Sequence, residues 1–294
     1  MGGIPEDLKV RVPTPREAAG MREVRSVLLR LRLHSICEGA QCPNAVECWS
    51  ARTATFLLLG DVCTRSCRFC AVTRGLVGAP LDPDEPRRLA EAVRELGLRH
   101  VVLTSVDRDD LPDGGASGFV TAVAEIHRTC RDVAVEVLIP DFGGSPQPVK
   151  AIAESGARVL SHNVETVRRL TPKLRDRRAS YDQSLRVLEL LAASSERRVI
   201  KSGLMVGLGE RSEEVVDALR DLRAAGVAAV TLGQYLSPSR AAAPVVRWVS
   251  RGEFSMYAEE ARALGFSHVL SGPRVRSSYH AEALLLPPCA ASST

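Results

Sequence analysis

Six of the eight cysteines in this 294-residue chain lie close together in the sequence, in two groups of three. The spacings are Cys37-x4-Cys42-x5-Cys48 and Cys63-x3-Cys67-x2-Cys70. Each triplet can supply three thiolates to one centre. An iron–sulfur cube takes four ligands, so a triplet of cysteines leaves one iron open to a ligand of another kind. The spacing therefore predicts two iron–sulfur clusters, each with one iron that no cysteine occupies.

Structural zinc and disulfides are the alternatives to clusters. Zinc prefers four ligands in two CxxC-type pairs, and neither triplet has a histidine at ligand spacing. Disulfides belong to secreted chains or to chains too small for a core, and this chain has no signal peptide and is not small. The other two cysteines have no partner pattern: Cys130 follows a helical stretch and is expected in the core, and Cys289 lies in a Pro/Ala/Ser-rich tail. Iron–sulfur chemistry is favoured.

The composition narrows the class of protein. A hydrophobic content of 45% over 294 residues suits one large α/β domain with short appendages. The net charge of +4 is mild, the arginines are dispersed and aromatic residues make up only 4%, so a nucleic-acid partner is not indicated. A weakly basic face would suit an acidic protein partner, although solvated charge is the simpler explanation. No apolar run is long enough to cross a membrane, and many reduced thiols without a targeting segment point to the cytoplasm.

Apolar, β-branched runs alternate with helical patterns along most of the chain. Several helical stretches end in a glycine followed by an apolar run, which is typical of a helix that stops and leads into a buried strand. This alternation predicts parallel βαβ units and hence a partial (β/α)6 TIM-like barrel. The predicted strands are Thr55–Leu59, His100–Thr104, Val133–Ile139, Val159–His162, Val199–Val206, Ala229–Gly233 and Ser267–Leu270. The predicted helices include Pro15–Leu33, Glu85–Glu95, Gly118–Arg128, Ser184–Ala193, Ser212–Ala225 and Arg251–Leu264.

Three parts of the chain are expected. Residues 1–52 form an N-terminal extension with the first triplet in a loop, residues 53–271 form the barrel, and residues 272–294 form a short C-terminal segment and tail.

Polar residues follow most strands, and the loops after the C-terminal ends of barrel strands form the active face. Asn163 and Glu165 follow an apolar strand two residues apart, so both can face the same side. Lys201 lies within a strand, in a chain with four lysines and 35 arginines, which favours a specific need for its ammonium group.

These residues carry a resemblance to a known family. The chain resembles the lipoyl synthases of the radical S-adenosylmethionine superfamily over about residues 30–280. The motifs that carry it are CEGAQCPNAVECW, CTRSCRFC, VVLTSVDRDDLPDGG, HNVETV, YDQSLRVL, GLMVGLGE, TLGQYLSP and RSSYHA.

The resemblance implies a role for each triplet. Cys63, Cys67 and Cys70 would hold the 4Fe–4S cluster that cleaves S-adenosylmethionine to a 5′-deoxyadenosyl radical. The first triplet would hold an auxiliary 4Fe–4S cluster, whose fourth ligand is a serine of the RSSY motif. We place this serine at Ser278, with Ser277 as the alternative. A hard oxygen ligand among soft thiolates should form the labile bond.

The resemblance also implies the reaction. Two sulfur atoms from the auxiliary cluster would be inserted at C6 and C8 of an octanoyl chain attached to a lysine of a lipoyl carrier protein, with two S-adenosylmethionine molecules used. An electron donor is required, and an iron–sulfur cluster carrier would rebuild the auxiliary cluster. Six residues are expected to bind S-adenosylmethionine. Asn163 and Glu165 would contact its ribose or amino end, and Arg178 and Lys201 would meet its carboxylate. Thr104 and Gln234 would be further contacts at the rim.

Two rival functions remain open. Another sulfur-inserting radical enzyme, similar to biotin synthase, would lack the N-terminal triplet and the RSSY motif. A non-enzymatic iron–sulfur carrier would need neither an open iron nor a large polar barrel rim. Formation of methionine and 5′-deoxyadenosine under reduction separates an enzyme from a carrier.

Overall fold

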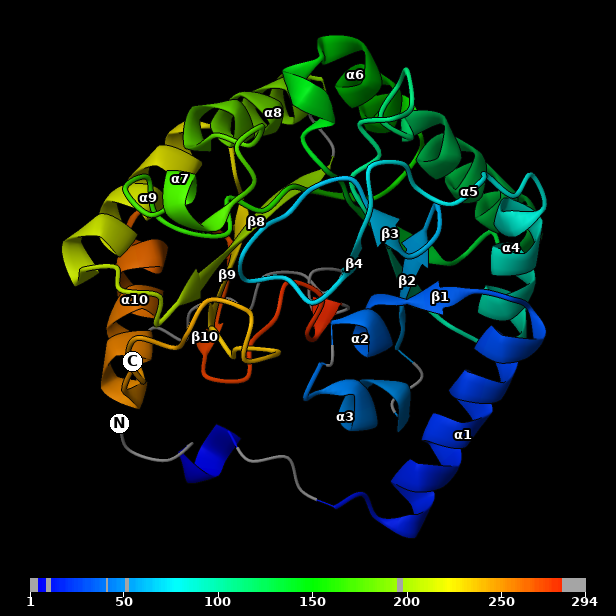
Figure 1. Ribbon diagram of the computed structural model, residues 1–294, viewed down its shortest axis with the longest axis horizontal. Coiled ribbons are helices and arrows are strands. Elements are labelled where there is room, and N and C mark those ends of the chain that lie inside the picture. Colours follow the sequence, from blue (N-terminus) through cyan, green and yellow to red (C-terminus); the bar gives the residue numbers. More distant parts are fainter. Residues whose placement is uncertain (1–4, 9–11, 41, 51–52, 195–197, 282–294) are drawn as a thin grey trace.

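The computed structural model describes residues 5–8, 12–40, 42–50, 53–194 and 198–281. In these residues, eight strands form one curved sheet in the order β1-β2-β5-β6-β7-β8-β9-β10, and helices cover its outer face (Figure 1). β1 pairs antiparallel with β2, and all other pairs are parallel. The strands of the sheet are β1 (His34–Ser35), β2 (Thr55–Leu58), β5 (His100–Ser105), β6 (Ala134–Leu138), β7 (Val159–Ser161), β8 (Val199–Val206), β9 (Ala229–Gln234) and β10 (His268–Gly272).

The predicted partial barrel is confirmed. Six strand–helix units run from β2 to α10, and β10 adds one more parallel strand. The helices of these units are α4 (Glu85–Glu95), α5 (Ala116–Thr129), α6 (Pro146–Glu154), α8 (Tyr181–Ala193), α9 (Ser212–Ala224) and α10 (Arg251–Ala263). The remaining elements are η1 (Glu6–Leu8), α1 (Pro15–Arg30), α2 (Ile36–Gly39), α3 (Ala45–Ser50), η2 (Phe142–Gly144), α7 (Thr171–Leu174) and the two-stranded pair β3 (Val62–Cys63) and β4 (Thr73–Arg74).

Helix α9 shows how local sequence sets these units. Its buried residues Val215, Ala218, Leu219 and Leu222 recur at helical spacing, so one face of the helix packs on the sheet. The helix stops just before Gly226, whose φ of 86° is a left-handed conformation that glycine adopts at little cost. The chain then enters β9 directly.

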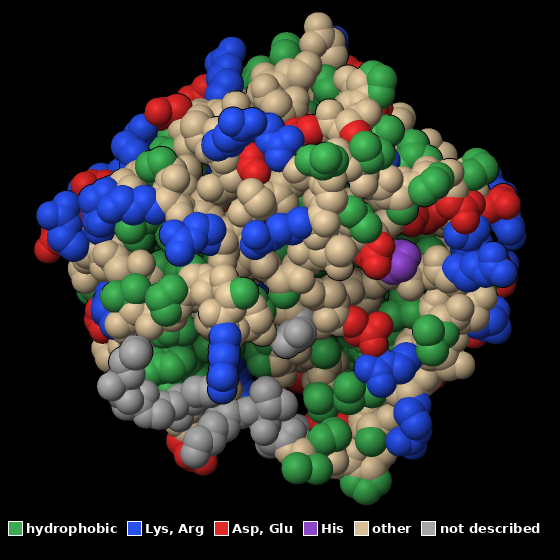
Figure 2. Space-filling model, in the orientation of Figure 1, with side chains coloured by type: hydrophobic (Ala, Val, Ile, Leu, Met, Phe, Trp, Pro, Cys, Tyr) green, Lys and Arg blue, Asp and Glu red, His purple; other side chains and the backbone are tan. Residues whose placement is uncertain are grey.

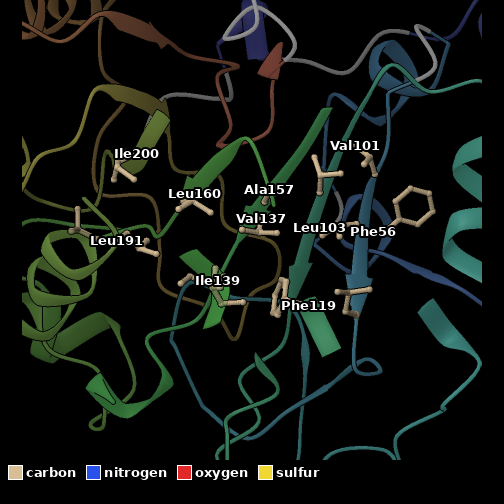
Figure 3. Close-up of a cluster of buried hydrophobic side chains, with 14 of the residues drawn as sticks. Phe56, Val101, Leu103, Phe119, Val137, Ile139, Ala157, Leu160, Leu191 and Ile200 are labelled. Atoms are coloured by element: carbon tan, nitrogen blue, oxygen red, sulfur yellow. The ribbon is translucent and has the colours of Figure 1, made fainter. Parts of the chain in front are cut away.

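The main core lies between the sheet and the outer helices. Val101 and Leu103 of β5 and Val137 of β6 are fully buried and belong to the same core cluster as Phe119 of α5, which is also fully buried (Figure 3). Residues of alternate parity point to the barrel interior, where polar and small side chains such as Thr104, Glu136, Lys201 and Gly203 predominate. The apolar packing therefore holds the sheet and its helices together and leaves the interior available for a site.

One expectation about the N-terminal extension needs correction. The first triplet is not in a loop, because Cys37 lies in α2 and Cys48 lies in α3. The Ser35 hydroxyl accepts a 3.1 Å hydrogen bond from the Cys37 amide and so starts α2. In the barrel, helix α6 was not named among the predicted helices; Pro146 stands in its first turn, where a proline is compatible with a helix.

The sheet is open in the part of the chain that the structure describes. β1 and β10 are its two edges and do not pair with each other. Helices α2 and α3 lie beside the segment that follows β10, on the side of the molecule where the barrel would close (Figure 1). Side-chain hydrogen bonds, described below, join these two regions. Short segments from the two ends of the chain thus occupy the place of a closing strand.

Candidate active site

A cavity of about 1200 Å³ lies inside the curved sheet. All three cysteines of the second triplet line it, together with Cys37 and Cys42 of the first. Ser277 and Ser278 line it as well, from the other end of the chain. Cys48 is half-buried and packs against the core. The fold therefore brings five of the six triplet cysteines and the C-terminal RSSY segment to one cavity.

The loop that carries the second triplet is built to hold sulfur. Each of its three Sγ atoms accepts a backbone hydrogen bond: Cys63 from Arg65 N at 3.4 Å, Cys70 from Val72 N at 3.5 Å and Cys67 from Asp176 N at 3.4 Å. The strand pair β3–β4 closes the loop at its base. Amide groups that point at the sulfurs stabilise thiolates and tune the potential of a bound cluster. The loop fits a cluster that three cysteines hold.

The thiols of this loop are hard to ionise without a metal. Burial raises the pKa of Cys67 to about 12. Burial, with Asp107 nearby, raises the pKa of Cys63 to about 11. Binding of a metal centre must therefore displace protons from these thiols. Among the described residues, no three Cys, His, Asp or Glu side chains gather as one metal ion would require, whereas the cysteines of a cube each bind a different iron and lie further apart.

Arg65 ties the cluster loop to the barrel. Its side chain is only 2% exposed and makes a two-pronged hydrogen bond to Asp141, at 2.6 and 2.7 Å. It also donates to both carboxylate oxygens of Asp109 and lies 3.2 Å from Asp107. Burial alone would raise the pKa of Asp141, but the hydrogen bonds from Arg65 outweigh it and hold the pKa at about 2. Sequence reasoning assigned no role to Arg65, although it lies inside the CTRSC motif.

Asp107 faces the cysteines from this same network. Its carboxylate lies 3.9 Å from the Cys63 Sγ atom and lines the cavity. Burial raises the pKa of Asp107 to about 6, although Arg65 opposes the shift. A carboxylate of this kind at the cavity wall is a candidate hydrogen-bond acceptor for a bound cation.

The segment after α7 fixes the cluster loop from the other side. Asp176 accepts hydrogen bonds from the amide and hydroxyl of Ser66, at 2.9 and 3.0 Å. Arg178 pairs with Asp176 and Asp109 and donates to the Thr64 carbonyl, so its guanidinium joins the segment to the loop. Arg178 does not line the cavity. The expectation that it contacts a cofactor is not supported, and Arg175 occupies the cavity wall in its place.

Two polar side chains, His162 and Ser184, orient Arg175. His162 is buried, and its Nδ1 lies 2.9 Å from the Ile139 carbonyl, which can only accept, so Nδ1 carries the proton. Its Nε2, 2.9 Å from the Ser184 Oγ atom, is then the acceptor. The same hydroxyl accepts a 2.6 Å hydrogen bond from Arg175. Burial lowers the pKa of His162 to about 4, which keeps the ring neutral.

Three of the residues predicted at the strand ends meet at the cavity wall. Asn163, Glu165 and Thr104 all line it. The Asn163 Oδ1 atom is buried and has no hydrogen-bond partner among the described residues. Glu165 has a φ of 67°, an uncommon conformation for a residue with a side chain, and burial raises its pKa. Thr104 instead donates to the Leu138 carbonyl at 3.0 Å.

The other two predicted contacts serve the protein itself. Gln234 lines the cavity, but its amide accepts from Val249 N and donates to the carbonyls of Tyr235 and Arg247, and so fixes the loop after β9. The Lys201 ammonium group forms a buried pair with Glu136, at 2.9 and 3.2 Å from its oxygens. Lys201 does not line the cavity. It lies on the same face of β8 as Gly203, which does line the cavity, but two residues nearer to the N-terminal end of the strand. The expectation that it meets a cofactor carboxylate is not supported.

Contacts across the open side of the barrel hold the first triplet next to the C-terminal segment. The Asn44 side chain donates a 2.7 Å hydrogen bond to the Arg274 carbonyl. Tyr279 donates to the Glu47 carboxylate at 2.9 Å. Arg276 lines the cavity near Cys42, and burial lowers its pKa. A serine of this segment is thus placed on the same cavity as Cys37 and Cys42.

Of the two other cysteines, the structure describes Cys130, which does not line the cavity. Cys130 is half-buried and packs against the core, in keeping with the packing role expected for it. Cys289 lies outside the described residues. The seven described cysteines are all free thiols, so no disulfide forms among them.

Comparison with known proteins defines the class. Residues 57–222, more than half of the chain, match the family model of the radical SAM superfamily, so the chain belongs to that superfamily. The chain is also 55% identical to a lipoyl synthase from Pyrobaculum arsenaticum, over 97% of this chain and 95% of the relative. It is 51% identical to a lipoyl synthase from Anaeromyxobacter dehalogenans, over 96% and 95% of the two chains. Within the superfamily, the chain belongs to the lipoyl synthase family.

Solved structures support the fold. Methylornithine synthase matches with a TM-score of 0.56 and 16% identity, over 85% of this chain and 76% of that one. The FeFe-hydrogenase maturase HydG from Carboxydothermus hydrogenoformans matches with a TM-score of 0.55 and 16% identity, over 94% and 81%. At this identity the likeness shows the fold alone.

No helix in the described part of the chain is both long and apolar enough for a membrane span.

Proposed function

We propose that this chain inserts two sulfur atoms, at C6 and C8, into an octanoyl chain that is attached to a lysine of a carrier protein. The observation that carries the proposal is the shared cavity, which is lined by the whole second triplet, by Cys37 and Cys42 of the first, and by Ser277 and Ser278. When bound, a cluster at the second triplet would supply the electron that cleaves S-adenosylmethionine, and a cluster at the first would supply sulfur. The protein has to hold both groups, orient the substrates and exclude water.

The polar wall of the cavity suits S-adenosylmethionine. The buried Asn163 carbonyl oxygen has no partner among the described residues, so it can accept a hydrogen bond from a ligand. Asp107 and Glu165 line the same cavity and can face the amino group and the ribose. Arg175, which Ser184 orients, can pair with the carboxylate. We therefore propose Arg175 in the role that sequence reasoning gave to Arg178 and Lys201.

The apolar wall suits the acyl chain. Around the first triplet, the cavity is lined by Met21, Ile36 and Val46. An octanoyl chain gains free energy when apolar side chains remove it from water, at about 25 cal/mol for each Å² buried. The acyl chain would therefore lie beside Cys37 and Cys42, next to the proposed source of sulfur.

The auxiliary centre would have a mixed ligand set. Cys37, Cys42 and Cys48 supply three thiolates, and Ser278, with Ser277 as the alternative, supplies the oxygen. A hard oxygen donor binds iron less firmly than a thiolate does, so this bond is suited to breaking when sulfur leaves. Arg276 next to Cys42 would offset negative charge at the centre.

The proposal implies three protein partners. They are the octanoylated carrier, an electron donor and an iron–sulfur carrier that restores the auxiliary centre. Seven free thiols among the described residues require a reducing compartment, for which we propose the cytoplasm.

One anaerobic experiment tests the proposed function. Cluster-loaded protein is assayed for iron and sulfide, then incubated with a reductant, S-adenosylmethionine and an octanoyl-lysine peptide. We expect about eight irons per chain, two 5′-deoxyadenosines per product, and a peptide whose mass shows two hydrogens replaced by two sulfurs. Stoichiometric zinc without sulfide would contradict the cluster assignment. Cleavage of S-adenosylmethionine without sulfur in the peptide would favour another radical enzyme, and no cleavage at all would favour a cluster carrier.

A further inference from the structure

Basic side chains gather where the cluster loop meets two other segments. We define the basic rim as residues 66–75, 171–178 and 237–243, which contain seven lysines and arginines and one carboxylate, Asp176. Backbone hydrogen bonds hold the three segments together: Arg68 N donates to the Leu174 carbonyl at 2.7 Å, and Ala243 N donates to the Arg68 carbonyl at 2.8 Å. The rim is therefore one continuous surface.

Five cations of the basic rim are exposed and have no carboxylate partner in the described part of the chain. Arg68 and Arg74 donate only to backbone carbonyls, of Lys173 and Cys67. Many other exposed arginines of the molecule are paired, as Arg128 is with Glu125. The five are Arg68, Arg74, Lys173, Arg177 and Arg240. Like charges held this close repel one another, and an acidic partner would relieve the repulsion.

The basic rim also borders the cavity. Phe69, Arg74, Ser237 and Pro238 belong to the rim and line the cavity. In Figure 2, Lys and Arg side chains lie across the centre of the face that α7 and the loop with β3 and β4 occupy in Figure 1. Leu76 and Val77, just after the rim, are 96% and 67% exposed, so apolar surface adjoins the charge.

We propose that the basic rim docks an acidic face of the carrier protein that bears the acyl chain. This inference rests on the proposed function. An acyl chain inside the cavity is attached through a lysine side chain to a folded carrier, so the carrier must sit over the residues that border the cavity. Five unpaired cations select carriers with carboxylates around the modified lysine and speed their approach. An electron donor carries no chain that enters the cavity, so nothing requires it to dock at the basic rim.

The test compares two matched charge reversals in cluster-loaded protein. The rim variant is Lys173→Glu with Arg177→Glu and Arg240→Glu, none of which lines the cavity. The control is Arg99→Glu with Arg131→Glu and Arg158→Glu, which are also exposed and without carboxylate partners in the described residues. They precede β5, β6 and β7 and so lie at the opposite end of the barrel. Both variants change the net charge equally.

We expect the rim variant to raise the KM for the octanoylated carrier roughly tenfold or more, with kcat and the KM for the octanoyl-lysine peptide unchanged. The control should match the wild type, and the wild-type KM for the carrier should rise with salt while that of the rim variant rises less. Equal carrier KM values in the rim variant and the wild type would overturn the inference. Slower reduction by an acidic protein donor, with carrier KM unchanged, would overturn it too and assign the rim to the donor. Failure of the proposed function is distinguishable, because the wild type would then modify neither carrier nor peptide.

Discussion

The Asn44 side-chain amide donates a 2.7 Å hydrogen bond to the carbonyl of Arg274, across 230 positions of sequence. Asn44 is 2% exposed and lies between Cys42 and Cys48, while Arg274 lies four residues before Ser278. The contact replaces the strand pairing that a closed barrel would make, since β1 and β10 remain unpaired edges. It holds the RSSY segment beside the segment of the first triplet, and Ser277 and Ser278 line the same cavity as Cys37 and Cys42.

Ser278 is the residue whose substitution tests this arrangement most directly. Ser278→Ala should retain both clusters, because three thiolates remain, but should form no sulfur-containing product. Ser278→Cys should hold iron more firmly and also fail, because a thiolate releases iron less readily than an oxygen ligand does. Iron, sulfide and product mass are measured on the same samples.

Ser277→Ala is the matched control, since Ser277 is adjacent and lines the same cavity. We expect it to keep activity. Full activity of Ser278→Ala would refute the role of that residue, and loss of activity in Ser277→Ala alone would move the ligand by one position.

The two triplets should separate by function. Cys67→Ala should abolish cleavage of S-adenosylmethionine, because Cys67 belongs to the loop whose three sulfurs accept backbone amides. Cys42→Ala should leave part of the cleavage and stop sulfur insertion. Release of 5′-deoxyadenosine and methionine is measured beside product mass. Equal loss of cleavage in two folded variants would count against the assignment.

The Arg65–Asp141 pair should contribute strongly to stability. Asp141→Asn removes one of the carboxylates that face a guanidinium only 2% exposed, while Asp107 and Asp109 remain beside it. The loss of a hydrogen-bonded pair with a charged group should then cost about 2 kcal/mol of unfolding free energy. Asp217→Asn is the control, because Asp217 pairs with Arg220 on the surface and its loss should change stability by about 0.5 kcal/mol or less. Urea unfolding of both variants gives the difference. Equal midpoints would show that the buried pair adds nothing.

His162 should make stability depend on pH in a defined window. The pKa of His162 is lowered from 6.5 to about 4 in the folded chain. Between these pH values the unfolded chain therefore binds a proton that the native state does not bind. Above pH 6.5, this group should not change the free energy of unfolding. Between pH 6.5 and pH 4, the free energy of unfolding should fall by at most about 1.4 kcal/mol per pH unit because of this group. His162→Gln keeps a donor and an acceptor but cannot titrate. Urea unfolding at several pH values should show a flatter slope for this variant, and identical slopes would assign the pH dependence to other groups.

The sequence by itself determined the parts that depend on local pattern. Ligand spacing singled out Cys63, Cys67 and Cys70, and the loop that holds them forms from residues close in sequence, with backbone amides of Arg65 and Val72 directed at two of the sulfurs. Apolar periodicity and glycine stops predicted β8 at its observed limits and α9 to within one residue, because one strand or helix buries its own apolar face.

Only the tertiary structure decided which polar residues reach the cavity. Arg175 and Arg178 are three residues apart in one basic segment, and sequence chose Arg178, but Asp109 and Asp176 bind that guanidinium outside the cavity. In the same way, the Lys201 ammonium group is held by Glu136, which comes from β6, a strand that neighbours β7 and not β8. Ion pairs between distant segments depend on three-dimensional distance, which spacing along the chain does not encode. The junction of Asn44 with Arg274 has the same origin, because it exists only where the two ends of the open sheet face each other.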